Sequence, residues 1–134
     1  MVSHVAAIIN LLFEQFPSPT IAGISPVPMP PKAGDPYVTV QEIMSKETES
    51  LTGPTNLSRS IIQIDVWDHD YEAANTLRTS IKDFLLAFTG DVVIASVIEA
   101  HIQGVNHQTD RELFNGDIER HQVLTRLQVW WETV

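Results

Sequence analysis

The sequence predicts an α+β fold in which an antiparallel sheet, built from two β-hairpins, is covered on one face by helices. Two observations lead to this class: apolar residues recur every three or four positions in two segments, and they alternate with polar residues in four others. In chain order the segments are helix, strand, strand, helix, strand, strand. Each strand pair is joined by a polar segment, which favours antiparallel hairpins. The 134 residues are predicted to form a single domain, 1–134.

The first element is a helix over residues 3–16, with Ser3 placed to cap its first turn. The residues at helical spacing are Val5, Ile8, Ile9, Leu12 and Phe16. The apolar stripe is wide, so this helix is either deeply buried or shared between the core and a neighbouring subunit. The segment lacks a basic start and is interrupted by Glu14, which predicts a helix of the mature protein, not a signal peptide or a membrane span.

Residues 17–36 carry seven of the eight prolines. Proline fixes φ and has no amide hydrogen to donate, so this segment is predicted to be neither a helix nor a central strand. We expect an extended, proline-rich arm on the surface of the domain. The alternative is that the arm is a proline-rich recognition ligand, in which case the protein would be a monomeric binding module.

A strand is predicted from Tyr37 to Met44 and another from Ser58 to Trp67, because apolar and polar residues alternate in both. Between them, Ser45 to Leu57 is polar and contains Gly53-Pro54, which predicts a long hairpin loop. A long polar loop with no role in the core is a natural site for contacts with a partner or a neighbouring subunit. The candidate contact residues in this loop are Lys46, Glu47, Glu49 and Leu51.

The second helix is predicted to begin at Tyr71, with Asp68 and Asp70 as candidate caps, and to stop before Gly90. Its apolar stripe, expected to be buried against the sheet, contains Leu77, Ile81, Leu85 and Phe88. The last part of the chain is predicted to hold a third strand from Val92 to Gln103, a turn-rich segment from Asn106 to Gly116, and a fourth strand from Ile118 to Glu132. In the fourth strand, Val123, Thr125, Leu127, Val129 and Trp131 share one face.

Charge and composition exclude several classes of function. The formal net charge is -9, from 17 acidic and 8 scattered basic residues, so binding to nucleic acid or to an anionic membrane surface is disfavoured. Cysteine is absent, which excludes disulfides, thiolate metal sites and a cysteine nucleophile. The sequence also contains no phosphate-binding loop and no nucleophile elbow.

The most enzyme-like cluster is Asp68-His69-Asp70, because a carboxylate next to an imidazole can orient a base or help to bind a metal. A small metal- or ligand-dependent enzyme would use Asp68 and His69 with His101 or His121, two residues expected to face each other on neighbouring strands. Asp68 and Asp70 also suit helix capping, and the histidines lack metal-ligand spacing. We therefore expect no cofactor, no metal and no catalytic residues.

Taken together, the motifs resemble those of the tail completion proteins of long-tailed bacteriophages, also called tail-to-head joining or tail terminator proteins. The stretches that carry the resemblance are Pro36 to Gln41, Leu51 to Pro54, Leu57 to Arg59, Ile62 to Trp67, Tyr71 to Ala74, and Arg126 to Trp130. The resemblance covers nearly the whole chain, from Met1 to Glu132.

The resemblance implies a non-enzymatic virion protein that assembles with itself into a ring, by analogy a hexamer, at the head-proximal end of the tail. It implies two partners, the tail tube protein and the head-completion protein, and assembly in the host cytoplasm. DNA would pass through the lumen of the ring without sequence-specific binding. An acidic subunit fits such a conduit, because a negative lumen does not retain passing DNA.

Overall fold

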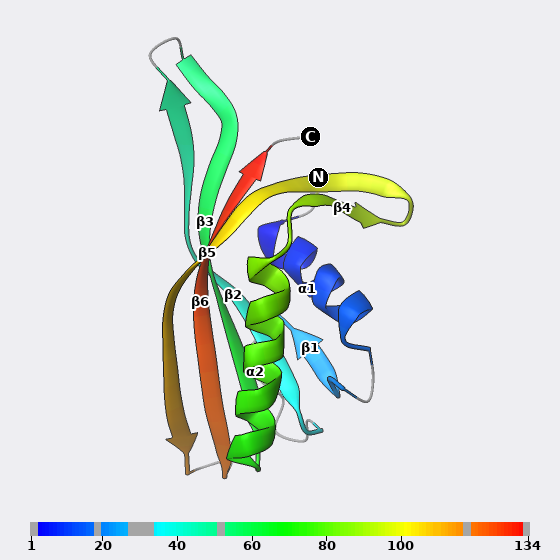
Figure 1. Ribbon diagram of the computed structural model, residues 1–134, viewed down its shortest axis with the longest axis vertical. Coiled ribbons are helices and arrows are strands. Elements are labelled where there is room, and N and C mark those ends of the chain that lie inside the picture. The colour runs from blue at the N-terminus through cyan, green and yellow to red at the C-terminus, as the bar shows by residue number, and fades with distance from the viewer. Residues whose placement is uncertain (1–2, 18–19, 27–33, 51–52, 117–118, 133–134) are drawn as a thin grey trace.

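The computed structural model describes residues 3–17, 20–26, 34–50, 53–116 and 119–132. The elements are α1 (His4–Gln15), β1 (Gly23–Ser25), β2 (Tyr37–Ser50), β3 (Gly53–Asp68), α2 (Tyr71–Leu86), β4 (Gly90–Ile94), β5 (Val97–Asn115) and β6 (Arg120–Glu132). Within the described residues the six strands form one curled sheet in the order β1-β2-β3-β6-β5-β4 (Figure 1). The predicted α+β class is confirmed. The predicted antiparallel-only sheet is wrong, because β1 pairs with β2 in parallel.

Both helices lie on the same side of the sheet, and one hydrophobic cluster joins them to it (Figure 1). Helix α2 packs against β3, β5 and β6, while α1 packs against β1, β2 and β4. Leu77, Ile81 and Leu85 are buried as predicted, and Phe88 is partly buried against the same cluster. The alternation predicted for the last strand is also confirmed: Val123, Thr125, Leu127, Val129 and Trp131 are all buried.

Polar side chains cap the start of both helices. The Ser3 hydroxyl accepts a hydrogen bond from the Ala6 amide (3.1 Å), which satisfies one of the free amides of the first turn of α1. Asp70 accepts from the Glu72 amide (3.0 Å) at the start of α2, and Asp68 accepts from the Asp70 amide (2.8 Å). The predicted caps of both helices are therefore present.

Strand β1 lies inside the segment predicted to be an extended, proline-rich arm, and it is a short strand at the end of the sheet that the predicted element order does not contain; residues 18–19 and 27–33 lie outside the described part. Gly23 pairs with Tyr37, and a β-carbon at Gly23 would overlap the Tyr37 ring. Glycine at this position therefore allows the strand to approach β2 closely.

The hairpin loop predicted from Ser45 to Leu57 is mostly strand. Strand β2 continues to Ser50 and β3 begins at Gly53, with Lys46 opposite Arg59 and Ser50 opposite Gly53. This β2–β3 hairpin projects beyond the rest of the molecule (Figure 1).

The predicted third strand is two strands. β4 and β5 are joined at Ala95 and Ser96, which have φ of 52° and 67°, the left-handed conformation that a tight hairpin turn requires. The segment from Asn106 to Gly116, predicted to be turn-rich, continues β5 as far as Asn115. Neither helix of the described chain is long and apolar enough to cross a membrane.

Candidate functional site

The predicted contact residues lie in the projecting β2–β3 hairpin. Lys46, Glu47 and Glu49 are on β2, where they pair with Arg59, Ser58 and Pro54 of β3; Leu51 lies outside the described residues. The candidate contact segment is therefore a paired hairpin and not an irregular loop. Its backbone is held in a ladder of paired residues.

The histidines and aspartates proposed for catalysis are not brought together. His101 pairs with Glu132 and His121 with Phe114, so they sit at opposite ends of the β5–β6 ladder, and the prediction that they face each other is wrong. His69 contacts Asp35, and His101 contacts Asp91 (2.7 Å). In the described part of the chain no three histidines or acidic residues are close enough to hold a metal.

Asp68 of β3 pairs directly with His121 of β6, so the two occupy the same row, meaning a line of paired residues across neighbouring strands. Each of them already has a structural partner. The His121 ring packs against Tyr71 and Phe114, with ring centroids 5.6 and 5.0 Å apart. Asp68 caps the turn before α2. A groove of about 470 Å³ beside α2 is lined in part by Asp68, Asp70 and Glu72. Two of these three carboxylates accept cap hydrogen bonds, so this groove does not resemble an active site.

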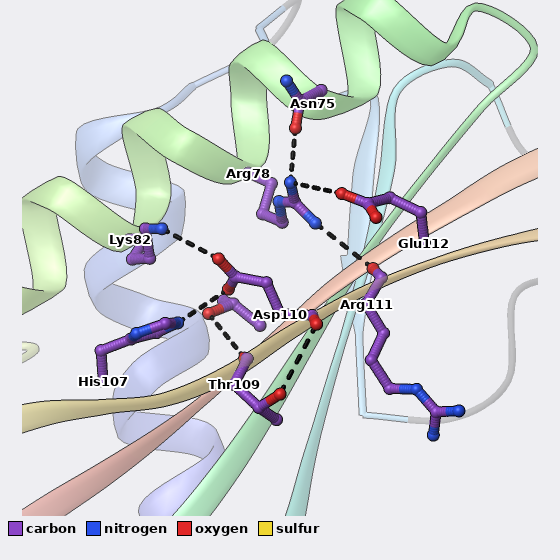
Figure 2. Close-up of polar contacts among 9 residues, drawn as sticks. Asn75, Arg78, Lys82, His107, Thr109, Asp110, Arg111 and Glu112 are labelled. Carbon is purple, nitrogen blue, oxygen red and sulfur yellow. Dashed lines mark hydrogen bonds and ion pairs between the residues drawn. The ribbon is translucent and has the colours of Figure 1, made fainter.

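A polar network links α2 to the part of β5 that lies beyond β4 (Figure 2). The buried Arg78 donates to the Glu112 carboxylate (3.0 Å), to the Arg111 carbonyl (3.3 Å) and to Asn75 (2.5 Å). One turn later along the helix, Lys82 donates to Asp110 (3.0 Å). We call these contacts the α2–β5 clamp. It fixes an edge strand against a helix by charge-assisted hydrogen bonds.

The clamp was not predicted, although the sequence contains a signal for it. Arg78 and Lys82 are four residues apart on a helix, and Asp110 and Glu112 are two apart on a strand, so each pair shares one face. Two cations on a helix face and two carboxylates on a strand face are a pattern for ion pairing. That signal was hidden because Asn106 to Gly116 was predicted to be turns.

The clamp changes the acidity of Asp110. Burial opposes ionisation of this carboxyl, but hydrogen bonds from Thr125, His107 and Lys82, with the Lys82 charge, outweigh burial and lower the pKa to about 2. His107 contacts the same carboxylate at 2.9 Å (Figure 2). Asp110 is therefore ionised over the whole physiological pH range.

The second face of the sheet has a buried polar cluster of its own, although neither helix lies on it. Asp65 is only 1% exposed and accepts hydrogen bonds from Thr39 (3.2 Å) and Gln63 (3.0 Å). Arg126 donates to the side-chain oxygen of Gln63 (2.8 Å), and the Trp67 indole donates to the Thr39 hydroxyl (3.1 Å). Burial raises the pKa of Asp65, although these donors oppose the rise.

Large apolar side chains are exposed near both edges of the sheet. Ile43 and Met44 on β2 are 46% and 42% exposed, and Leu113 and Phe114 on β5 are 47% and 61% exposed. Val93, Val97 and Ile98 are also exposed around the β4–β5 turn. Exposed apolar groups mark an interaction surface where they form a contiguous patch, whereas single ones are normal on a protein surface.

The comparisons with known proteins give a fold likeness over the whole chain. No protein-family model matches the sequence, and no curated protein matches it. Among solved structures, a chain from the virion of a native gene transfer agent particle matches with a TM-score of 0.66 and 16% identity, over 98% of this chain and 99% of that one. A second solved chain, 10% identical over 98% of this chain and 97% of its own, has a TM-score of 0.45, too low to carry an argument. This chain therefore shares its fold with a chain of a virion particle.

Proposed function

We propose that this chain is a structural, non-enzymatic virion subunit that forms a ring, by analogy a hexamer, at the head-proximal end of a phage-type tail. There it stops growth of the tail tube and joins the tube to the head-completion protein. The observation that carries the proposal is the fold likeness to a chain of a gene transfer agent virion, which extends over nearly the whole of both chains. The resemblance of the sequence motifs to tail terminators points in the same direction.

Features of the described residues support an assembly role over an enzymatic one. The catalytic candidates Asp68 and His69 are engaged in capping and in an ion pair, and His101 lies at the far end of the sheet. The features without a role in the fold are a projecting hairpin, exposed apolar side chains and open sheet edges. These are surfaces for partners and not for substrates.

The proposal assigns the projecting β2–β3 hairpin to contacts with the tail tube or with the next subunit. The hairpin extends past the body of the molecule, so it can reach a partner without moving the core (Figure 1). The net charge of -9 suits a ring around passing DNA, because repulsion from phosphates keeps the DNA from adhering.

The decisive experiment uses the purified protein and the tail tube protein encoded with it. Tubes are assembled with and without this protein and imaged by negative-stain electron microscopy. We expect tubes of limited length, each with a ring at one end, when the protein is present. Tubes that keep the same length distribution and bear no terminal density would overturn the proposal.

A further inference from the structure

The outermost long strands of the sheet are only partly covered. β1 pairs with β2 over Tyr37 to Thr39 alone, and β4 pairs with β5 over Val97 to Ile102 alone. No strand of the described chain pairs with the outer side of β2 over residues 40–50 or of β5 over residues 104–115. Such open edges present backbone amides and carbonyls that can form a ladder with another strand.

The two open edges lie level with each other at opposite sides of the sheet. The register places Val40 in the same row as Asp110, and Lys46 in the same row as Gly104. Between these rows each edge has seven residues, 40–46 and 104–110, because each contains a register shift: one between Glu42 and Met44, the other between His107 and Thr109. The two open segments are therefore matched in length as well as in height.

The directions of the two strands also match. β2 is antiparallel to β3, β3 to β6, and β6 to β5, so β2 and β5 run in opposite directions. A second copy, placed beside the first in the same orientation, would bring its β5 alongside β2 as an antiparallel pair. Contact between two different surfaces of identical subunits repeats from copy to copy, and it forms a ring when the rotation between neighbouring copies closes.

The side chains in matching rows are compatible with such pairing. Glu42, which contacts His4 (3.1 Å) in its own chain, lies in the row of His107, which contacts Asp110 (2.9 Å), so an acidic group of one copy would lie opposite an imidazole of the next. The other matching rows join Gln41 to Thr109, Met44 to Asn106, and Ser45 to Val105. No row places two groups of the same charge together, which would be unfavourable across a strand pair. Ile43 and Met44, both exposed in the single chain, lie on the segment that would be covered.

We propose that copies of this chain join by antiparallel pairing of β2 residues 40–46 with β5 residues 104–110 of the next copy, so that one sheet continues around the ring. The inference rests on the proposed ring and identifies the two surfaces that form it. The α2–β5 clamp then has a role in assembly, because Lys82 and Arg78 hold the edge of β5 in place for its neighbour.

Cysteine cross-linking tests the pairing directly, because the chain has no cysteine of its own. Gln41→Cys and Thr109→Cys are combined in one chain, since these positions share a row and lie on the sheet face opposite the helices. Paired strands bring the two α-carbons within the 4.4–6.8 Å that a disulfide spans. After mild oxidation, alone and with assembled tail tubes, we expect a ladder of disulfide-linked oligomers on a non-reducing gel.

Three control variants make the result specific. Each single variant, Gln41→Cys or Thr109→Cys, has one cysteine per copy, and the same residue of neighbouring copies lies too far apart in a ring for a disulfide. The double variant should therefore give roughly tenfold more cross-linked product than either single variant. In the third control, Gln41→Cys is combined with Leu113→Cys, which lies four residues beyond Thr109 on the same face of β5. This variant should give no ladder of disulfide-linked oligomers. Circular dichroism before oxidation establishes that each variant is folded.

The outcomes separate this inference from the proposed function. Rings seen by microscopy without a ladder would overturn the edge pairing and leave the tail role standing. A ladder formed by a protein that leaves tubes uncapped would support the pairing and overturn the tail role. A ladder of equal yield in the displaced control would also overturn the pairing, because it would show that cross-linking does not depend on register.

Discussion

Asp65 and Asp110 have their pKa values moved in opposite directions, and burial and partners together explain the difference. Asp65 is almost fully buried, and burial prevails over its hydrogen bonds from Gln63 and Thr39 and over the Arg126 charge, so its pKa rises. Asp110 is less buried and contacts the Lys82 ammonium, so its pKa falls to about 2. Asp110 is therefore the carboxylate that stabilises the folded state as an anion, because it is less buried and because its hydrogen bonds and the Lys82 charge outweigh that burial.

Asp110→Asn is expected to remove an acid-sensitive part of the stability. A folded-state pKa of about 2 lies below the unfolded value of about 3.9, so the ionised form stabilises the fold at pH above about 4. That contribution is lost as the pH falls from about 4 to about 2. The substitution should lower the unfolding free energy by about 1 to 2 kcal/mol at pH 7, after allowance for partial exposure of the pair. It should also make the unfolding free energy of the variant fall less steeply than that of the parent between pH 4 and pH 2.

The measurement for Asp110→Asn is urea unfolding at a series of pH values, and Asp83→Asn is the matched control because Asp83 is exposed on α2. The control should follow the parent protein across the series. An Asp110→Asn variant that lost stability between pH 4 and pH 2 as steeply as the parent would contradict the role given to the clamp.

Leu85→Ala and Leu86→Ala compare adjacent leucines of α2 with different surroundings. Leu85 is 1% exposed and part of the core, whereas Leu86 is 36% exposed. Truncating Leu85 removes buried apolar surface and leaves a cavity, which costs about 2 to 5 kcal/mol. Leu86→Ala should cost less than about 1 kcal/mol. Equal shifts of the chemical denaturation midpoint in the two variants would show that this side of α2 is not packed as described.

At the scale of elements, the sequence predicts the parts of the sheet that have one buried face. Ile62, Ile64 and Val66 alternate with polar residues because one side of β3 meets the helices, and that strand was found. The segments from 45 to 57 and from 106 to 115 have no such alternation, so the sequence predicts loops there, whereas most of these residues are in strands. Apolar and polar residues alternate along a strand only where one face of the strand is buried. Sheet edges and projecting hairpins therefore lack this alternation, and the sequence does not reveal them as strands.

Turn chemistry explains the remaining errors. The β4–β5 turn uses Ala95 and Ser96 with positive φ, where glycine or asparagine is usual, so nothing in the sequence marked a hairpin there. β1 was missed because its three residues lie among prolines and are held by pairing with β2. The candidate contact residues Lys46, Glu47 and Glu49 were placed between the right two strands, but their strand geometry depends on pairing that no local pattern reveals.

Shortening the β2–β3 hairpin should separate folding from assembly. Glu47 and Ser58 are directly opposite, so residues 48–57 can be replaced by Asn-Gly, a two-residue turn suited to antiparallel strands. The core residues of both strands remain, and shortening a hairpin has a small entropic effect, so the variant should stay folded with little change in melting temperature. It should no longer cap tail tubes in negative-stain images. Tubes capped as efficiently as by the parent would remove the hairpin from the assembly surfaces.

At the scale of the whole molecule, the chain combines one hydrophobic core with two partly open sheet edges. One face of the sheet, both helices and their apolar stripes form a single hydrophobic cluster. Ile43 and Met44 on β2 and Leu113 and Phe114 on β5 are exposed and lie outside that cluster, whereas Val40 and Val105 on the same two strands belong to it. The proposed role requires a chain that folds before it assembles, and a hydrophobic cluster formed within the single chain meets that requirement.

The acidity of the chain makes a further prediction about the ring. Each copy has a net charge of -9, so neighbouring copies repel each other, while strand pairing and apolar contacts attract. The repulsion reaches about 30 Å at 10 mM salt and about 8 Å at 150 mM, so added salt weakens it far more than it weakens apolar contacts or backbone hydrogen bonds. At fixed protein concentration, the ring fraction measured by sedimentation velocity should therefore rise between these two salt concentrations.

Neutralising acidic groups away from the proposed edges should have the same effect as salt. Glu72→Gln with Asp83→Asn removes two exposed carboxylates of α2, so the double variant should form more ring than the parent at 10 mM salt and a similar amount at 150 mM. If the ring fraction instead fell as salt was added, attraction between opposite charges would be the main force between copies. In that case the contact between subunits would have to be sought among the ionised side chains and not along the open edges of β2 and β5.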